Sequence, residues 1–165
     1  MSWTEAQVKQ IVEMALSRLE TEQRYLLEHD ASERAMVFHL GGYIQQQITR
    51  ETDIVVDFDY NREGEKKDPK TAYLQNGELK NVVPDIIIHK RGPAGPNILA
   101  LEVKRTKNAS YEELLEIKEI EHDRQKLVGY LKDHNYGFAA HVFIISKEKR
   151  LKDQNNYMVK WVQKP

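Results

Sequence analysis

The 165-residue chain contains no cysteine. This absence excludes disulfide bonds and zinc sites built on thiolates. The sequence also lacks a signal-peptide pattern and a long apolar run, so we expect a soluble, cytoplasmic protein that does not cross a membrane. Hydrophobic residues make up 40% and charged residues 31%. That composition indicates a globular chain, and the length suits one domain, 1–165, with a substantial core.

The chain also lacks a strong net charge, at −1, so it has no overall basic excess of the kind that many nucleic-acid binders carry. The charge is unevenly distributed, however. Residues 1–83 carry ten Lys or Arg and fifteen Asp or Glu, whereas residues 84–165 carry fifteen and eleven. The basic excess of the second half is compatible with a local phosphate-binding face of modest affinity.

Two apolar segments between Val82 and Thr106 flank a turn rich in glycine and proline, Arg91 to Pro96. This pattern predicts a β-hairpin. Antiparallel pairing across the six turn residues sets Lys90 opposite Asn97. Both segments are apolar on both faces, which is typical of central strands that are covered on two sides.

The same register sets Asp85 opposite Glu102, with Cβ atoms roughly 5 Å apart. Lys104 lies on the face of Glu102 because strand side chains alternate. Opposed like charges destabilise a sheet unless something lies between them. The hairpin therefore predicts a site for a divalent cation, and the alternative interpretation is a salt-bridged pair at the open end of a hairpin.

Pro84-Asp85, followed after a short hairpin by Glu102-Val103-Lys104, resembles the PD-(D/E)XK nuclease superfamily. The resemblance covers residues 32–146 and implies the restriction-endonuclease-like fold, an α/β (α+β) domain with a central mixed β-sheet of about five strands flanked by helices. It implies that Asp85, Glu102 and the carbonyl oxygen of Val103 hold one or two Mg²⁺ (or Mn²⁺) ions. It also implies that Lys104 activates water or stabilises the charge of the phosphate.

A helix is predicted from Ser32 to Thr49, with Ser32 as its N-cap and Glu33 at the border of its apolar stripe. Two interpretations of Glu33 stay open. A first-turn glutamate favours the helix dipole, whereas in many members of the resembled superfamily a glutamate on this helix contributes to the metal site. Gly41-Gly42 in mid-helix indicates close packing against another backbone.

The other predicted elements follow from hydrophobic periodicity and capping signals. Two further helices are predicted to flank the sheet. One has Thr4 as its N-cap, and the other opens with a capping box formed by Ser110 and Glu113. The predicted ranges are a helix from Thr4 to His29, a strand from Asp53 to Tyr60, a helix from Ser110 to Asn135, and strands from Phe138 to Ser146 and from Tyr157 to Val162.

In the resembled superfamily, the helix after the E-x-K strand often places a Lys, Gln or Tyr near the active site. Asp123, Lys126 and Tyr130 are therefore candidates for phosphate or nucleic-acid contacts, whereas Gln125 points nearly opposite to the buried stripe. Surface ion pairing of Asp123 with Lys126 is the alternative explanation.

A second acidic pair, Asp57 and Asp59, lies on one face of the predicted strand at 53–60. We interpret these residues as the polar side of a half-exposed strand. An enzyme of another class built around them has little support from any motif.

The sequence therefore predicts a metal-dependent nuclease that hydrolyses phosphodiester bonds of DNA, or of RNA, with Asp85, Glu102, Lys104 and Glu33 at its centre. The alternative is a non-catalytic nucleic-acid-binding or assembly subunit with the same fold. The protein is expected to act as a homodimer or within a larger complex, because dimers are common in the resembled superfamily.

Overall fold

The structure is a computed structural model that describes residues 3–29, 31–48, 53–60, 70–73, 79–92, 95–107, 113–114, 117–145 and 155–164. Its centre is a five-stranded mixed sheet with the order β1-β4-β5-β6-β7. Strands β5 and β6 pair in parallel, and the other neighbours pair antiparallel. The predicted mixed α/β sheet flanked by helices is thus confirmed.

The helices and strands follow the predicted order, with an additional small two-stranded sheet, β2-β3. The helices are α1 (Glu5–Glu22), α2 (Arg24–Glu28), α3 (Glu33–Gln47) and α5 (Lys118–Asp133). The strands are β1 (Ile54–Phe58), β2 (Thr71–Tyr73), β3 (Leu79–Asn81), β4 (Ile86–Lys90), β5 (Asn97–Thr106), β6 (Phe138–Ile145) and β7 (Tyr157–Val162).

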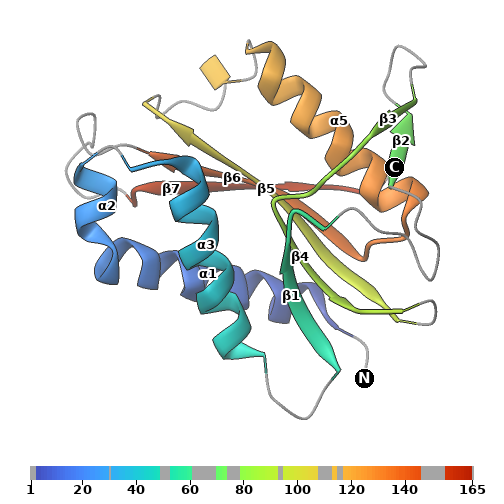
Figure 1. Ribbon diagram of the computed structural model, residues 1–165, viewed down its shortest axis with the longest axis horizontal. Coiled ribbons are helices and arrows are strands. Elements are labelled where there is room, and N and C mark those ends of the chain that lie inside the picture. Colours follow the sequence, from blue (N-terminus) through green and yellow to red (C-terminus); the bar gives the residue numbers. More distant parts are fainter. Residues whose placement is uncertain are drawn as a thin grey trace.

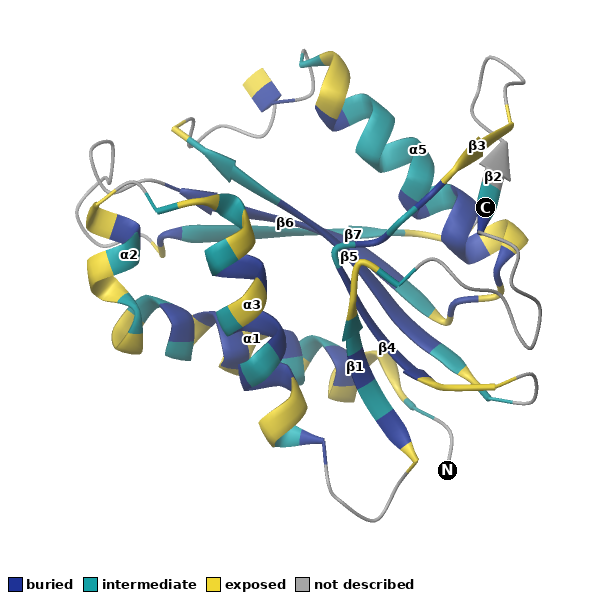
Figure 2. Cartoon of the chain, in the orientation of Figure 1, coloured by how far each residue is buried: buried dark blue, intermediate teal, exposed yellow. Residues whose placement is uncertain are grey.

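The sheet separates two helical layers, with α1 and α3 on one face and α5 on the other (Figure 1). Strands β4, β5 and β6 are buried along most of their length, whereas exposed residues gather on the outer sides of the helices (Figure 2). Ile86, Ile87 and Ile88 are all fully buried, as expected for a central strand that is covered on both faces. No helix within the described ranges is long and apolar enough to span a bilayer.

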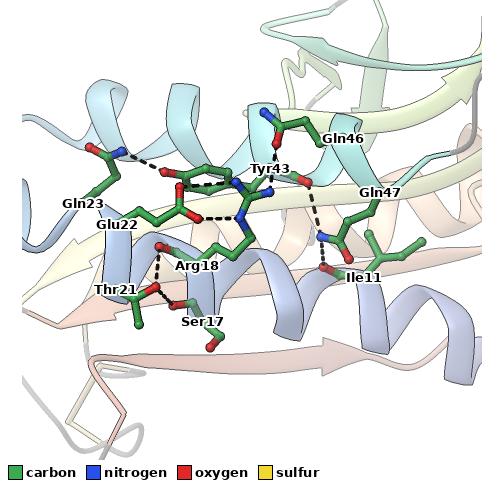
Figure 3. A network of polar contacts seen from close by, with 9 residues as sticks. All are labelled: Ile11, Ser17, Arg18, Thr21, Glu22, Gln23, Tyr43, Gln46 and Gln47. Carbon is green, nitrogen blue, oxygen red and sulfur yellow. Dashed lines mark hydrogen bonds and ion pairs between the residues drawn. The ribbon is translucent and has the colours of Figure 1, made fainter.

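Polar contacts join α1 to α3 at the edge of their apolar interface (Figure 3). The guanidinium of Arg18 lies 4.3 Å from the centre of the Tyr43 ring, and it donates a hydrogen bond to Gln46 (2.9 Å). Gln23 donates to the hydroxyl of Tyr43 (2.7 Å). These contacts fix the N-terminal helices beside the sheet, so that Glu33, the first residue of α3, has a defined position.

The predicted hairpin register is correct next to the candidate site and wrong at the turn. Ile86 pairs with Leu101 and Ile88 with Leu99, as predicted, but His89 rather than Lys90 lies opposite Asn97. A β-bulge explains the difference, since it adds one residue to β5. Ile98 and Leu99 both pack into the core beneath α1 and α3.

Two predicted helices are shorter than expected. The helix predicted from Thr4 to His29 breaks at Gln23, although the capping box that Thr4 forms with Gln7 is present. The helix predicted from Ser110 to Asn135 is interrupted at Ile117, whose backbone is extended (ψ 118°): Glu113 and Leu114 are helical, and α5 begins at Lys118. Ser110 itself lies outside the described residues.

Gly41 is explained by packing, though not against a backbone as predicted. A Cβ atom at this position would lie 2.1 Å from Cε1 of the Phe58 ring, so only glycine allows this approach of α3 to β1. Gly42 has open space around it, and nothing in the structure explains it.

Candidate active site

The candidate site lies where β5 continues beyond the start of β4. Strand β4 begins at Ile86, opposite Leu101, whereas β5 runs on to Thr106. On this side of β5, beyond the start of β4, acidic side chains accept the backbone hydrogen bonds that a neighbouring strand would otherwise accept. Asp85 Oδ2 accepts a hydrogen bond from the N–H of Val103 (2.6 Å), and Glu33 Oε2 accepts one from the N–H of Arg105 (2.8 Å). Both carboxylates therefore satisfy backbone donors that would otherwise lack a partner.

Glu102 projects from β5 toward α5 and is only 3% exposed. Its Oε2 accepts a hydrogen bond from Nζ of Lys126 (2.9 Å), and its Oε1 accepts one from the hydroxyl of Tyr130 (3.2 Å). Tyr130 is fully buried. The predicted proximity of α5 to the E-x-K strand is thus present, and both α5 residues contact the glutamate itself.

Asp123 and Lys126 form the predicted ion pair (2.8 Å), but not on the surface, since their side chains are only 15% and 16% exposed. Lys126 therefore bridges two carboxylates, Asp123 and Glu102. Gln125 donates to Glu121 instead, in agreement with its predicted orientation away from Glu102.

Burial dominates the protonation of the acidic pair. It raises the pKa of Asp85 to about 6, although the N–H of Val103 and the charge of Lys126 act in the opposite direction. Burial likewise raises the pKa of Glu102 to about 8, against the effect of Lys126 and with a further increase from the charge of Asp85. The charge of Asp85 therefore acts on Glu102, and burial makes each of the two carboxyl groups costly to ionise.

Lys126 shows the complementary effect. Burial lowers the pKa of its ammonium group, but the carboxylates of Glu102 and Asp123 more than offset this, so that the pKa lies above its ordinary value. At neutral pH the lysine is thus positively charged inside the cluster.

Lys104 and Glu33 lie at the more exposed edge of the site. The Nζ atom of Lys104 is 3.9 Å from Oε1 of Glu33, with side chains 34% and 38% exposed. The charge of Glu33 also raises the pKa of Asp85, so the α3 carboxylate acts on the same site. Glu33 thus has both properties that the sequence left open, a first-turn position and proximity to Asp85.

The donor set fits a hard cation in its chemistry, because carboxylate oxygens are the preferred ligands of Mg²⁺. Asp85 Oδ1 makes no hydrogen bond to the described residues and is available for such a ligand. Within those residues, however, no group of three or more His, Asp or Glu side chains is arranged to hold a metal ion. Asp85 and Glu102 supply two ligands, and Glu33, whose Oε2 accepts from the N–H of Arg105, has its Oε1 atom as a third.

Asp57 belongs to a separate cluster and does not point to water as predicted. Its side chain is 12% exposed and contacts Nε2 of His89 (2.8 Å) and Nε of Arg91 (2.8 Å). The hydrogen bond from Arg91 is the largest effect that lowers the pKa of Asp57. Ion pairing within the β1–β4 ladder explains this carboxylate. Asp59 is exposed, as predicted; it has a positive φ of 47°, and its backbone N–H donates to the carbonyl oxygen of Asp85 (3.4 Å).

One buried polar residue beside Glu102, His141 on β6, was missed by the sequence analysis. The parallel register pairs His141 directly with Glu102. A single histidine within the apolar segment FAAHVFII was the available signal, but its relevance depends on the β5–β6 register, which the sequence does not reveal.

A comparison of the chain with models of known protein families, with curated proteins and with solved structures gave no match.

Proposed function

We propose that this protein is a metal-dependent nuclease that hydrolyses phosphodiester bonds, with DNA as the favoured substrate and a restriction-endonuclease-like arrangement of its sheet. The observation that carries the proposal is the convergence of the half-buried Asp85 and the fully buried Glu102, where burial raises the pKa of both carboxyl groups and the charge of Asp85 raises that of Glu102 further. Carboxyl groups with strongly perturbed pKa values cluster at functional sites.

In this proposal, Asp85 and Glu102 hold Mg²⁺ or Mn²⁺, with Glu33 and the carbonyl oxygen of Val103 as additional ligands. When bound, such a cation lowers the pKa of a coordinated water and polarises the phosphate. Lys104 lies on the same face of β5 as Glu102 and is partly exposed, so its ammonium group is placed to stabilise negative charge that develops on the phosphate oxygens.

The α5 residues have a supporting role in the same proposal. Tyr130 and Lys126 each donate a hydrogen bond that orients Glu102. With Glu102 bound to a cation, the ammonium group of Lys126 would be placed to contact a phosphate group while it remains paired with Asp123. The nucleic-acid contacts predicted for Asp123, Lys126 and Tyr130 thus reduce to one direct contact, from Lys126.

The proposal is tested by incubating the protein with Mg²⁺ and a mixture of DNA and RNA substrates. We expect cleavage by the wild type and a loss of at least about 100-fold in Glu102→Ala and Lys104→Ala. Lys132→Ala, on the exposed last turn of α5, is the matched control and should cleave like the wild type. Equal cleavage by all four proteins would assign the activity to a contaminant.

A second candidate function is a non-catalytic nucleic-acid-binding or assembly subunit. The specific observation in its favour is that Lys126 and Tyr130 already donate hydrogen bonds to Glu102 and that the N–H of Arg105 already donates one to Glu33, so both side chains have partners without a cation. Binding of DNA or RNA without cleavage, at a strength that does not depend on Mg²⁺, would support this alternative.

A further inference from the structure

His141 is a buried histidine in the middle of the sheet, directly beside the candidate site. It pairs with Glu102 on β5 and with Lys160 on β7, so its side chain lies on the α5 face of the sheet together with Glu102. The residue is only 2% exposed. Its Nε2 atom has no hydrogen-bond partner among the described residues.

An unpartnered nitrogen at this position is costly. A buried polar atom without a hydrogen bond destabilises a fold, because it loses its hydrogen bonds to water and gains none in return. The neighbouring positions on β6 are occupied by apolar residues such as Ala140 and Val142, and a phenylalanine would fill a similar volume without this penalty. The imidazole is therefore explained better by a contact that it makes when the site is occupied than by packing.

The surroundings of His141 connect it to the acidic cluster. Its ring lies 4.2 Å from the ring of Phe143, which covers one side. Asp123 and Lys126 on α5, and Lys104 on β5, are close enough to influence the imidazole electrostatically. The imidazole is thus buried next to the strand position proposed to hold the cation and within electrostatic reach of the helix that supplies the counter-charge.

We propose that His141 is a positioning residue of the candidate site, whose Nε2 accepts a hydrogen bond from a bound water that donates its second O–H to the Glu102 carboxylate. A carboxylate has lone pairs for this third hydrogen bond in addition to those from Tyr130 and Lys126. The water fixes the orientation of Glu102 toward the cation. This inference rests on the metal site of the proposed function, though not on nuclease activity.

The test compares Mn²⁺ affinity, measured by calorimetry at one fixed pH, in two variants of this residue. His141→Phe retains the planar ring but removes the nitrogen, and we expect its affinity to fall about tenfold or more. His141→Gln places an amide near the position of Nε2, and we expect its affinity to stay within about threefold of the wild type. Wild-type affinity in His141→Phe would overturn the inference.

A second buried histidine serves as the control. His134, at the C-terminal end of α5, contacts the carbonyl oxygen of Thr71 through Nε2 (2.7 Å) and lies outside the acidic cluster. We expect His134→Phe to lower thermal stability without changing Mn²⁺ affinity. An equal loss of affinity in His134→Phe and His141→Phe would show a general effect of disturbing the fold, and would also overturn the inference.

Nuclear magnetic resonance of the wild type avoids the risk that a variant fails to fold. The ¹⁵N shift of His141 Nε2 should change when Mg²⁺ is added, whereas that of His134 should not. An unchanged His141 signal at saturating Mg²⁺ overturns the inference.

The outcomes separate the two proposals: cleavage and cation binding that are both intact in His141→Phe refute only the role of His141. Cation binding that depends on His141 in a protein without cleavage refutes only the nuclease.

Discussion

At the scale of single residues, the acidic side chains of the site accept hydrogen bonds that stabilise the fold, and in the proposed function they also hold a cation. Asp85 and Glu33 each accept a hydrogen bond from a β5 backbone N–H that no strand reaches. A purely structural interpretation explains these two contacts completely. It does not explain Glu102, which is buried against α5 and whose pKa is raised by that burial. Substitutions of Glu102 therefore distinguish a structural role from a functional one.

The buried carboxyl of Glu102 should make stability depend on pH. Because its pKa rises from 4.5 to about 8 on folding, the folded state keeps a proton that the unfolded chain has released. The free energy of unfolding therefore falls as pH rises through this interval, by up to about 1.4 kcal/mol per pH unit. The same effect of Asp85 occurs at lower pH, because its pKa in the folded state is about 6. We expect a decrease of about 1 kcal/mol between pH 7 and 8 in urea denaturation without divalent cations.

Glu102→Gln is the matched variant for this measurement. The amide keeps the shape of the side chain but cannot ionise, so its free energy of unfolding should be flat between pH 7 and 8. His89 and His141 interfere little, because burial lowers the pKa of both in the folded state and the unfolded histidines have lost most of their protons by about pH 7.5. Parallel pH curves for the wild type and Glu102→Gln would refute the assignment of the raised pKa.

Lys126 and Glu102 should be energetically coupled. Lys126→Met removes the ammonium group 2.9 Å from Glu102 and leaves the carboxyl buried without its counter-charge. At pH 9, where Glu102 is ionised, we expect a loss of about 3–5 kcal/mol in the free energy of unfolding. The same substitution should cost much less in Glu102→Gln, and Lys132→Met on the exposed face should change little. A coupling energy near zero would show that the pair does not interact as described.

At the scale of elements, local patterns predicted the parts of the fold that depend on local chemistry. Ser32 and Thr4 cap their helices as expected, and β7 has the predicted bounds. The length of the turn gave the correct register next to Asp85 because the bulge at Ile98 offsets the one-residue shift of the pairing at the turn. The bulge at Ile98 could not be predicted, since it depends on core space beneath α1 and α3.

The errors of the helix predictions have a similar origin. Gln23 and Ile117 are compatible with helical periodicity, yet the chain bends at each of them. At Gln23 the bend accompanies a hydrogen bond to Tyr43 on a different helix. His141 was likewise missed because its neighbour in space, Glu102, is 39 positions earlier in the chain. These features depend on tertiary contacts, which periodicity does not contain.

The adjacent glycines of α3 provide a matched pair for testing helix packing. Ala at Gly42 meets no atom within 4 Å, so Gly42→Ala should stabilise the protein by about 0.5–1 kcal/mol through helix propensity. Gly41→Ala should not, because its Cβ would overlap the Phe58 ring. Thermal or urea denaturation measures both. In a Phe58→Ala background the penalty at Gly41 should disappear, and equal stabilisation by both alanines in the wild type would contradict the packing described.

At the scale of the whole molecule, the site is assembled from both helical layers. Glu33 comes from the layer that covers one face of the sheet, Lys126 and Tyr130 come from the other, and Asp85 and Glu102 come from the chain between them. A ligand that binds all of these residues would therefore link the two layers. The consequence is that occupation of the site should stabilise the entire fold rather than one element.

Thermal unfolding with and without Mg²⁺ measures this consequence. A cation present at about 100 times its dissociation constant adds about 2.7 kcal/mol to the free energy of unfolding, which raises Tm by roughly 5–10 °C for a chain of this size. Asp85→Asn should lose most of this gain. Asp53→Asn, at an 80% exposed carboxylate paired with Lys90 at the far end of β4, should retain it. Equal stabilisation of the wild type and Asp85→Asn by Mg²⁺ would mean that the cation binds elsewhere, and the two carboxylates would then be structural groups that complete the open end of β5.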